Sequence, residues 1–149
     1  MMKASNEIKE LIKGWEGLRL TAYRCPAGVL TIGYGHTGPD VVPGLRISRE
    51  RAAELFEADL ARFEAELNRW MTIDGASLGQ AQYDAVLSFA YNVGTSALRR
   101  STLWKKVCVN SDDPSIPAEF RKWIRAGGRV LDGLVKRRER EAAIYAGGK

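Results

Sequence analysis

The chain has 149 residues, of which 45% are hydrophobic and 28% are charged, and its formal net charge is +5 at pH 7. This composition can bury a core, which excludes an intrinsically disordered chain, and the length suits one compact domain rather than two independent ones. The positive charge favours anionic partners such as nucleic acid, acidic lipid or an acidic cell-wall polymer, but it does not choose among them.

Residues 1–7 contain no apolar stretch like that of a signal peptide, and no part of the sequence approaches the ~20 apolar residues of a membrane span. We therefore expect a protein that is made and kept in the cytoplasm. The two cysteines, Cys25 and Cys108, are too few for a disulfide scaffold, so we expect free thiols.

The first predicted element is a short amphipathic helix. Its apolar residues have the i, i+3, i+4, i+7 spacing of one helical face, at Ile8, Leu11, Ile12 and Trp15. Ser5 or Asn6 can cap the start of this helix, and Gly17 is a natural stop. Glu16 is therefore expected at the C-terminal end of the helix.

Residues 18–38 are predicted to form two short strands joined by a turn at residues 26–28, where Pro and Gly occur. Gly33, Gly35 and Gly38 indicate tight backbone turns or a close approach to a ligand.

Ser48 is predicted to cap a long helix that continues to about Trp70 and could join two lobes. Its buried side repeats at steps of four and three residues, at Ala52, Phe56, Leu60, Phe63, Leu67 and Trp70. Further helices are expected over residues 80–93, 102–109, 118–126 and 134–145, with a turn near Leu98 and a break at residues 127–128. In the first of these, the predicted core positions are Ala81, Ala85, Val86, Phe89 and Ala90. The charged run at residues 135–141 is interpreted mainly as a solvated helix face, because acids are interleaved with the bases.

The most informative segment is residues 15–37, which contains Trp-Glu-Gly, Ala-Tyr-Arg-Cys and Thr-Ile-Gly-Tyr-Gly-His. It resembles the N-terminal motif of phage-type lysozymes, glycoside hydrolase family 24. In that family a catalytic Glu is followed nine positions later by Asp, or in some members by Cys, and a Thr comes six positions after that. Glu16, Cys25 and Thr31 have this spacing.

Two further segments extend the resemblance over nearly the whole chain. Residues 82–94 are similar to the family's C-terminal lobe motif, and residues 134–141 are similar to its closing helix. The resemblance implies an α+β, lysozyme-like fold in which a long helix joins a small N-terminal lobe with a β-hairpin to a larger helical C-terminal lobe. We expect a single domain, 1–149, divided into a first-helix and hairpin lobe (1–50), a linking helix (48–70) and a helical lobe (71–149).

Cleavage of a glycosidic bond needs a carboxylic acid that protonates the leaving oxygen, so the pKa of that acid must be raised. The partial negative charge of a helix C-terminus disfavours ionisation of Glu16, and the resemblance assigns this residue the role of general acid. The hydroxyl of Thr31 can orient the attacking water. Cys25 stands where most relatives have a carboxylate; as a thiolate it could orient water or act as a nucleophile, which leaves the stereochemical outcome open.

Three more residues are expected at the site. By resemblance, Tyr91 and Asn92 contact the sugar, although core packing explains Tyr91 nearly as well. Arg137 is expected to approach Glu16 and to hold it or the carboxyl groups of the substrate, with a solvated helix position as the alternative. The single histidine, His36, is expected to be structural, as in relatives, and no metal-binding pattern or cofactor motif is present.

The resemblance implies a muramidase, an enzyme that cleaves the bond between N-acetylmuramic acid and N-acetylglucosamine in bacterial peptidoglycan and causes host-cell lysis. Without an export signal, the enzyme would remain in the host cytoplasm until a holin lets it pass to the periplasm and cell wall. We expect it to act as a monomer, with no cofactor, no metal and no nucleic acid partner.

Three alternatives remain open from the residues alone. Cys25 makes a non-catalytic peptidoglycan-binding module on the same fold conceivable, and such a module would bind walls without clearing cells. A lytic transglycosylase would use Glu16 as its sole acid and base and would release anhydro-sugars. A DNA-binding protein is supported only by the arginines of residues 135–140, and it would show salt-sensitive binding to duplex DNA.

Overall fold

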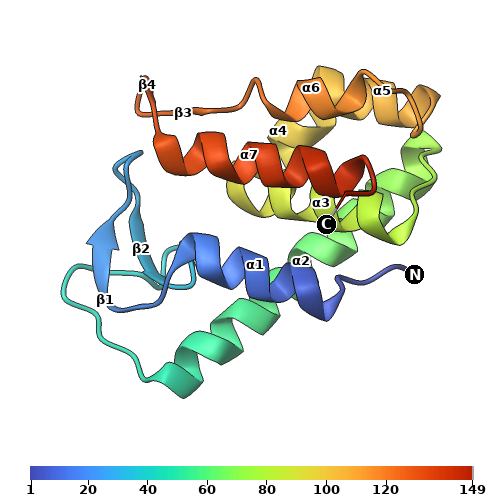
Figure 1. Cartoon of the computed structure of the whole chain (residues 1–149). Helices are drawn as coiled ribbons and strands as arrows, with labels where there is room; N and C mark the ends of the chain where they lie inside the picture. Colours follow the sequence, from blue (N-terminus) through green and yellow to red (C-terminus); the bar gives the residue numbers. More distant parts are fainter. Residues whose placement is uncertain (149) are drawn as a thin grey trace.

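The computed structural model, which describes residues 1–148, leads from a first helix through a hairpin and a long helix into a helical lobe (Figure 1). The first half of the chain contains α1 (Asn6–Glu16), β1 (Arg19–Arg24), β2 (Leu30–Gly33) and α2 (Arg49–Asp74). The second half contains α3 (Gln80–Val93), α4 (Thr95–Arg100), α5 (Thr102–Val109), α6 (Ile116–Phe120), β3 (Arg125–Ala126), β4 (Arg129–Val130) and α7 (Asp132–Tyr145). This is the α+β arrangement that the sequence predicts.

Helix α1 begins and ends where the sequence predicts. The hydroxyl oxygen of Ser5 accepts a hydrogen bond from the N–H of Ile8 (3.2 Å), and Gly17, at φ +70°, ends the helix with its N–H on the carbonyl of Lys13. Ile8 and Ile12 are buried in the larger hydrophobic cluster, together with residues of the helical lobe. The buried face of the first helix therefore packs with the helical lobe.

Strands β1 and β2 form the predicted antiparallel hairpin, in which Tyr23 lies opposite Thr31. Two backbone hydrogen bonds of Cys25, at 2.7 and 2.9 Å, close the turn between the strands. The hairpin lobe has a small hydrophobic cluster of its own, formed by Ile32, Val41 and Leu55.

Helix α2 contributes to both hydrophobic clusters, and it can therefore link the two lobes. Leu55 belongs to the small cluster, and the large cluster contains Phe56, Leu60 and Leu67. The helix continues beyond its predicted end near Trp70 until Gly75, in the left-handed conformation at φ +74°, terminates it. None of the helices in residues 1–148 is both long and apolar enough to cross a membrane.

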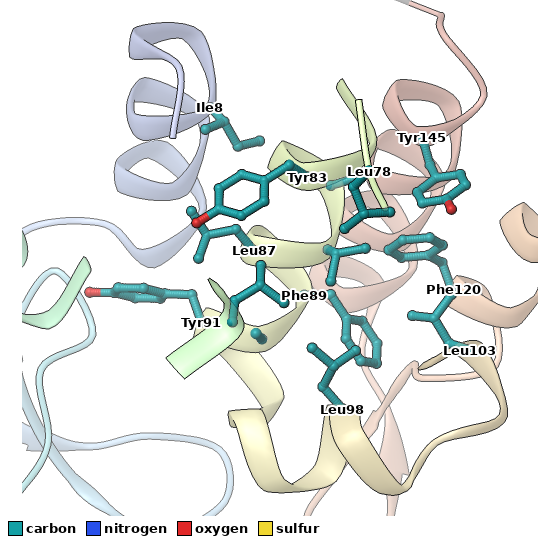
Figure 2. Packing of buried hydrophobic residues seen from close by; sticks show 14 of the residues in the cluster. Ile8, Leu78, Tyr83, Leu87, Phe89, Tyr91, Leu98, Leu103, Phe120 and Tyr145 are labelled. Carbon is teal, nitrogen blue, oxygen red and sulfur yellow. The ribbon is translucent and has the colours of Figure 1, made fainter. Parts of the chain in front are cut away.

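Helix α3 forms the centre of the helical lobe, and its side chains meet those of several neighbouring helices (Figure 2). All of residues 83–91 are buried. Ala81, a predicted core position, is exposed because the first turn of the helix faces solvent. Two polar residues, Asp84 and Ser88, are buried in the helix instead.

Two segments differ from the sequence-based expectation. The turn predicted near Leu98 is the short helix α4. Residues 118–126, predicted as a helix, contain the end of α6 and strand β3. The reason is that Gly127 and Gly128, at φ +57° and +77°, form the two-residue turn of a β3–β4 hairpin rather than a helix stop.

One side of α7 is buried, so the interpretation of residues 135–141 as a mainly solvated face is wrong. Arg137, Arg138 and Glu141 are 3%, 1% and 0% exposed. Lys136 and Glu139, on the other side of the helix, are exposed. The buried side packs against α3, which gives the charged residues partners inside the protein.

Candidate active site

Glu16 ends helix α1, and its side chain is 17% exposed. Gly35, in the loop that follows β2, lies against its carboxyl group: a Cβ at this position would be 2.5 Å from Oε1. The backbone of Gly35 has φ +77°, which also favours glycine. At Gly35 the close approach is therefore to the side chain of Glu16.

Arg137 reaches Glu16 from helix α7, which is the approach that we expect from the sequence. Its Nη1 donates to Oε2 of Glu16 at 2.6 Å, and its guanidinium lies 5.0 Å from the centre of the Trp15 ring. Because Arg137 is 3% exposed, this ion pair is largely shielded from water and salt. The pair joins the first helix of the chain to the last.

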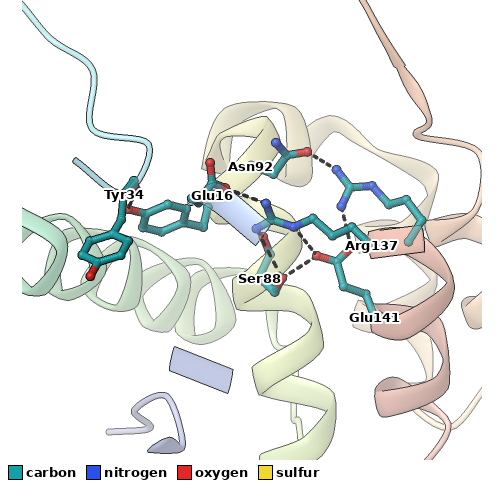
Figure 3. Close-up of polar contacts among 8 residues, drawn as sticks. Glu16, Tyr34, Ser88, Asn92, Arg137 and Glu141 are labelled. Atoms are coloured by element: carbon teal, nitrogen blue, oxygen red, sulfur yellow. Dashed lines mark hydrogen bonds and ion pairs between the residues drawn. The ribbon is translucent and has the colours of Figure 1, made fainter. Parts of the chain in front are cut away.

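Arg137 belongs to a group of polar side chains, which we call the α7 network (Figure 3): the buried Arg137, Arg138, Glu141 and Ser88, and the exposed Asn92. Glu141 accepts hydrogen bonds from Arg137 Nε (3.2 Å), Arg138 Nη1 (2.6 Å) and Ser88 Oγ (2.5 Å). Arg137 also donates to the carbonyl of Ser88 (2.9 Å), and Arg138 donates to the side-chain oxygen of Asn92. Each buried charge therefore meets an opposite charge or a polar partner, as burial requires.

The loop that carries Gly35 is held in place by His36. The backbone of His36 pairs with that of Ile32 (2.8 and 2.9 Å), and its ring nitrogens bond to Asp59 (2.8 Å) and Asp40 (2.9 Å). Burial lowers the pKa of His36, but the two carboxylates outweigh this effect and raise the pKa above its ordinary value. These bonds agree with the structural role expected for His36.

The hairpin residues Cys25 and Thr31 differ in their surroundings. Thr31 is 3% exposed, and its hydroxyl donates to the carbonyl of Val29 (2.9 Å). Cys25 is a free, partly exposed thiol where β1 runs into the turn.

Tyr23 of β1, which sequence reasoning missed, is a partly buried residue of the same hairpin. Burial raises the pKa of Tyr23, and the neighbouring charge of Glu16 acts in the same direction, whereas that of Arg19 lowers it. Tyr23 lies opposite Thr31 in the antiparallel pair, and directly opposed residues place their side chains on the same face of the sheet. Its place in the predicted hairpin, opposite Thr31, is the sequence signal that could have identified it.

Tyr91 and Asn92, the expected sugar contacts, are placed differently. Tyr91 is 8% exposed, its ring centre lies 5.8 Å from that of Phe56, and its hydroxyl donates to the carbonyl of Tyr34 (2.8 Å). Burial also raises its pKa. The structure thus favours the packing alternative for Tyr91. Asn92 is exposed next to it, and its side-chain oxygen is bonded to Arg138.

The tips of the two hairpins approach each other (Figure 1). A Cβ on Gly127, in the β3–β4 turn, would lie 2.9 Å from the carbonyl oxygen of Pro26 in the β1–β2 turn. This contact places the β1–β2 turn against the β3–β4 turn that precedes α7. Within residues 1–148, no group of three or more His, Cys, Asp and Glu side chains is placed to hold a metal ion.

Comparisons with known proteins agree on one family. The family model described as phage lysozyme matches residues 13–141. The endolysin of Bacillus phage B103 is 42% identical over 150 residues, which cover 99% of this chain and 56% of the endolysin. The endolysin of Acyrthosiphon pisum secondary endosymbiont phage 1 is 44% identical over 148 residues, which cover 97% of this chain and 98% of that protein. Among solved structures, an endolysin from Escherichia coli O157:H7 phage FAHEc1 has a TM-score of 0.79 at 32% identity and covers 97% of this chain and 93% of its own. The chain therefore spans about half of the first relative and nearly all of the second.

Proposed function

The chain belongs to the phage lysozyme family. We propose that it is an endolysin-type glycoside hydrolase that degrades peptidoglycan in host lysis, and that it cuts the bond between N-acetylmuramic acid and N-acetylglucosamine with Glu16 as the proton donor. The observation that carries this proposal is the fixed, partly exposed carboxyl of Glu16 at the end of α1. Arg137 holds Oε2, which leaves Oε1 to carry the proton to the glycosidic oxygen.

The attacking water is proposed to be oriented from the hairpin. The hydroxyl proton of Thr31 is donated to the carbonyl of Val29, so the oxygen of Thr31 presents lone pairs that can accept a hydrogen bond from water. Such an acceptor turns a lone pair of the water toward the anomeric carbon. Cys25 is proposed to line the same face, where its thiolate form would stabilise the positive charge that develops on the sugar.

Asn92 and Arg137 are proposed to contribute to substrate binding. Asn92 is the exposed member of the α7 network, and its side-chain NH₂ can donate to a sugar hydroxyl while its oxygen is held by Arg138. Tyr91 is proposed to act indirectly instead: through its bond to the Tyr34 carbonyl it holds the loop that carries Gly35.

Glu16→Gln tests this proposal, because glutamine keeps the shape of the side chain and cannot donate an acidic proton. We expect loss of clearing of permeabilised bacteria by at least about 10²-fold, the range typical of general acids. Glu10→Gln is the matched control, since Glu10 is an exposed residue of the same helix that pairs only with Lys13 at the surface (3.7 Å). Clearing by Glu16→Gln at the rate of the parent would exclude Glu16 as the donor.

The products separate the proposed hydrolysis from its alternatives. Mass spectrometry of released muropeptides should show reducing sugar ends that contain the added water. Anhydro-sugar ends would instead identify a lytic transglycosylase, and binding to walls without release of fragments would identify a binding module.

We further propose that the enzyme acts as a single-domain monomer, with one lobe on each side of the substrate. It would remain in the host cytoplasm until a holin permeabilises the membrane and would then act on the wall. Sedimentation at micromolar concentration should give one species of the chain mass, which is 16.5 kDa. Expression in bacteria should cause lysis only when the membrane is permeabilised; lysis without permeabilisation would exclude the need for a holin.

A further inference from the structure

Glu141 is a buried carboxylate one step removed from the proposed proton donor: it bonds to Arg137, and Arg137 bonds to Glu16. It is 0% exposed, and both of its oxygens are used. Oε2 accepts from Arg137 (3.2 Å) and Ser88 (2.5 Å), and Oε1 accepts from Arg138 (2.6 Å). Its oxygens accept from three side-chain donors, two of them cationic, so Glu141 has the partners that a buried carboxylate requires.

The charges in this chain of contacts balance only while Glu16 is ionised. Arg137 and Arg138 supply two positive charges, and Glu141 and Glu16 supply two negative ones. When Glu16 takes up the proton that it must give to the glycosidic oxygen, one positive charge is left over. Glu141 then supplies one negative charge against the two positive charges of the guanidinium groups.

We propose that Glu141 is a positioning residue for the proton donor, Glu16. It fixes the guanidinium of Arg137 against Glu16. Its negative charge also limits how strongly the two arginines favour the ionised form of Glu16, which cannot donate a proton. This proposal rests on the proposed role of Glu16. Without the charge of Glu141, two positive groups would face the donor, and it would lose its proton at lower pH. The active form would then be confined to a narrower pH range.

The other titratable and charged side chains around Glu16 are not altered in the variants that test this proposal. Tyr23 from β1 and Tyr91 from α3 lie within electrostatic range of Glu16, and because burial raises the pKa of both, they remain neutral below pH 9 or so. Lys13 of α1 lies over the ring of Tyr34 at 5.7 Å and keeps its charge. From the hairpin, the thiol of Cys25 is common to all the variants, as is His36 with its two carboxylate partners behind the Gly35 loop.

The test compares pH profiles of lytic rate in the parent, Glu141→Gln, Arg138→Gln and Glu139→Gln, all at one fixed ionic strength. We expect the alkaline limb to move down by about one pH unit in Glu141→Gln and to move up in Arg138→Gln, since these changes remove opposite charges from the network. Glu139→Gln is the matched control. It makes the same charge change on the same helix, but Glu139 is 56% exposed and pairs with Arg121 at the surface (3.1 Å), so we expect no displacement.

The proposal is overturned if the alkaline limb of the pH profile does not move in Glu141→Gln, or if it moves equally far in Glu139→Gln. If circular dichroism shows that Glu141→Gln is not folded, Arg138→Gln provides the test. An alkaline limb of Arg138→Gln that stays in place or moves to lower pH overturns the proposal. Failure of the proposed function looks different, because Glu16→Gln would then remain active. A merely structural role for Glu141 would lower the rate at every pH and leave both limbs where they are.

Discussion

Replacing Gly35 by Ala should reduce catalysis far more than stability. The added Cβ would lie 2.5 Å from Oε1 and 2.9 Å from Cδ of Glu16, and since real Cβ contacts stay above 3.0 Å, the carboxyl must move by at least about 0.5 Å. The backbone at φ +77° adds roughly 1–2 kcal/mol of strain once a Cβ is present. Because misplacing a catalytic group by about 1 Å can cost 10²-fold, we expect kcat to fall by about 10- to 100-fold, while the unfolding free energy falls only by the strain.

The matched control for this prediction is Gly44→Ala. Gly44 has φ +81°, and nothing lies within 4 Å of the position that its Cβ would take, so the variant carries the same backbone strain with no contact to Glu16. The assay is the lytic rate on purified peptidoglycan, together with urea unfolding of both variants. Equal loss of kcat in the two variants, or a loss in Gly35→Ala that only follows its unfolded fraction, would refute the reasoning.

Two further predictions concern Cys25 and His36. Cys25→Ser should cause partial to severe loss of lytic activity with little change in thermal stability, because a serine hydroxyl keeps the polarity but does not ionise as a thiol does. Cys108→Ser is the control. Equal activity in the two variants would show that the sulfur of Cys25 is not needed. His36→Gln should lower stability most at low pH. The pKa of His36 is raised in the folded state, so its contribution is fully present below the unfolded pKa of ~6.5 and is lost as pH rises through the folded pKa. Urea unfolding at about pH 5 and about pH 9 should therefore show the larger difference from the parent at about pH 5, and a larger difference at about pH 9 would contradict the assignment.

Local sequence rules predicted the elements that depend on neighbouring residues. Ser5 caps α1, Gly17 ends it, and the hairpin turn falls where Pro and Gly occur, because these residues act through backbone geometry within a few positions. The β3–β4 hairpin was not predicted, although two adjacent glycines are a known signal for a two-residue hairpin turn. Its strands are two residues each, too short to show an alternating pattern.

The candidate site could be predicted only in part, since its contacts join distant segments. The position of Glu16 at a helix end follows from spacing, whereas its contact with Gly35 depends on the loop that His36 holds. The burial of Glu141 was not predictable from residues 135–141, because interleaved charges on a helix have the same pattern whether they face solvent or one another. Only the packing of α7 on α3 decides between the two.

The buried charges of α7 are better explained by catalysis than by stability. Burying two arginines and a glutamate carries a desolvation cost that ion pairing offsets only in part, and apolar side chains of similar volume often stabilise a core as well or better. Apolar surroundings are already present: Arg137 lies 5.0 Å from the ring centre of Trp15, and Arg138 lies 4.9 Å from that of Phe89. An apolar residue in place of Arg137 could fill this space, but it could not hold one oxygen of Glu16 and leave the other to carry a proton. The α7 network therefore lies where the enzyme needs an acid that is held in position. A variant in which apolar residues replace the charged residues of the network should be stable and inactive.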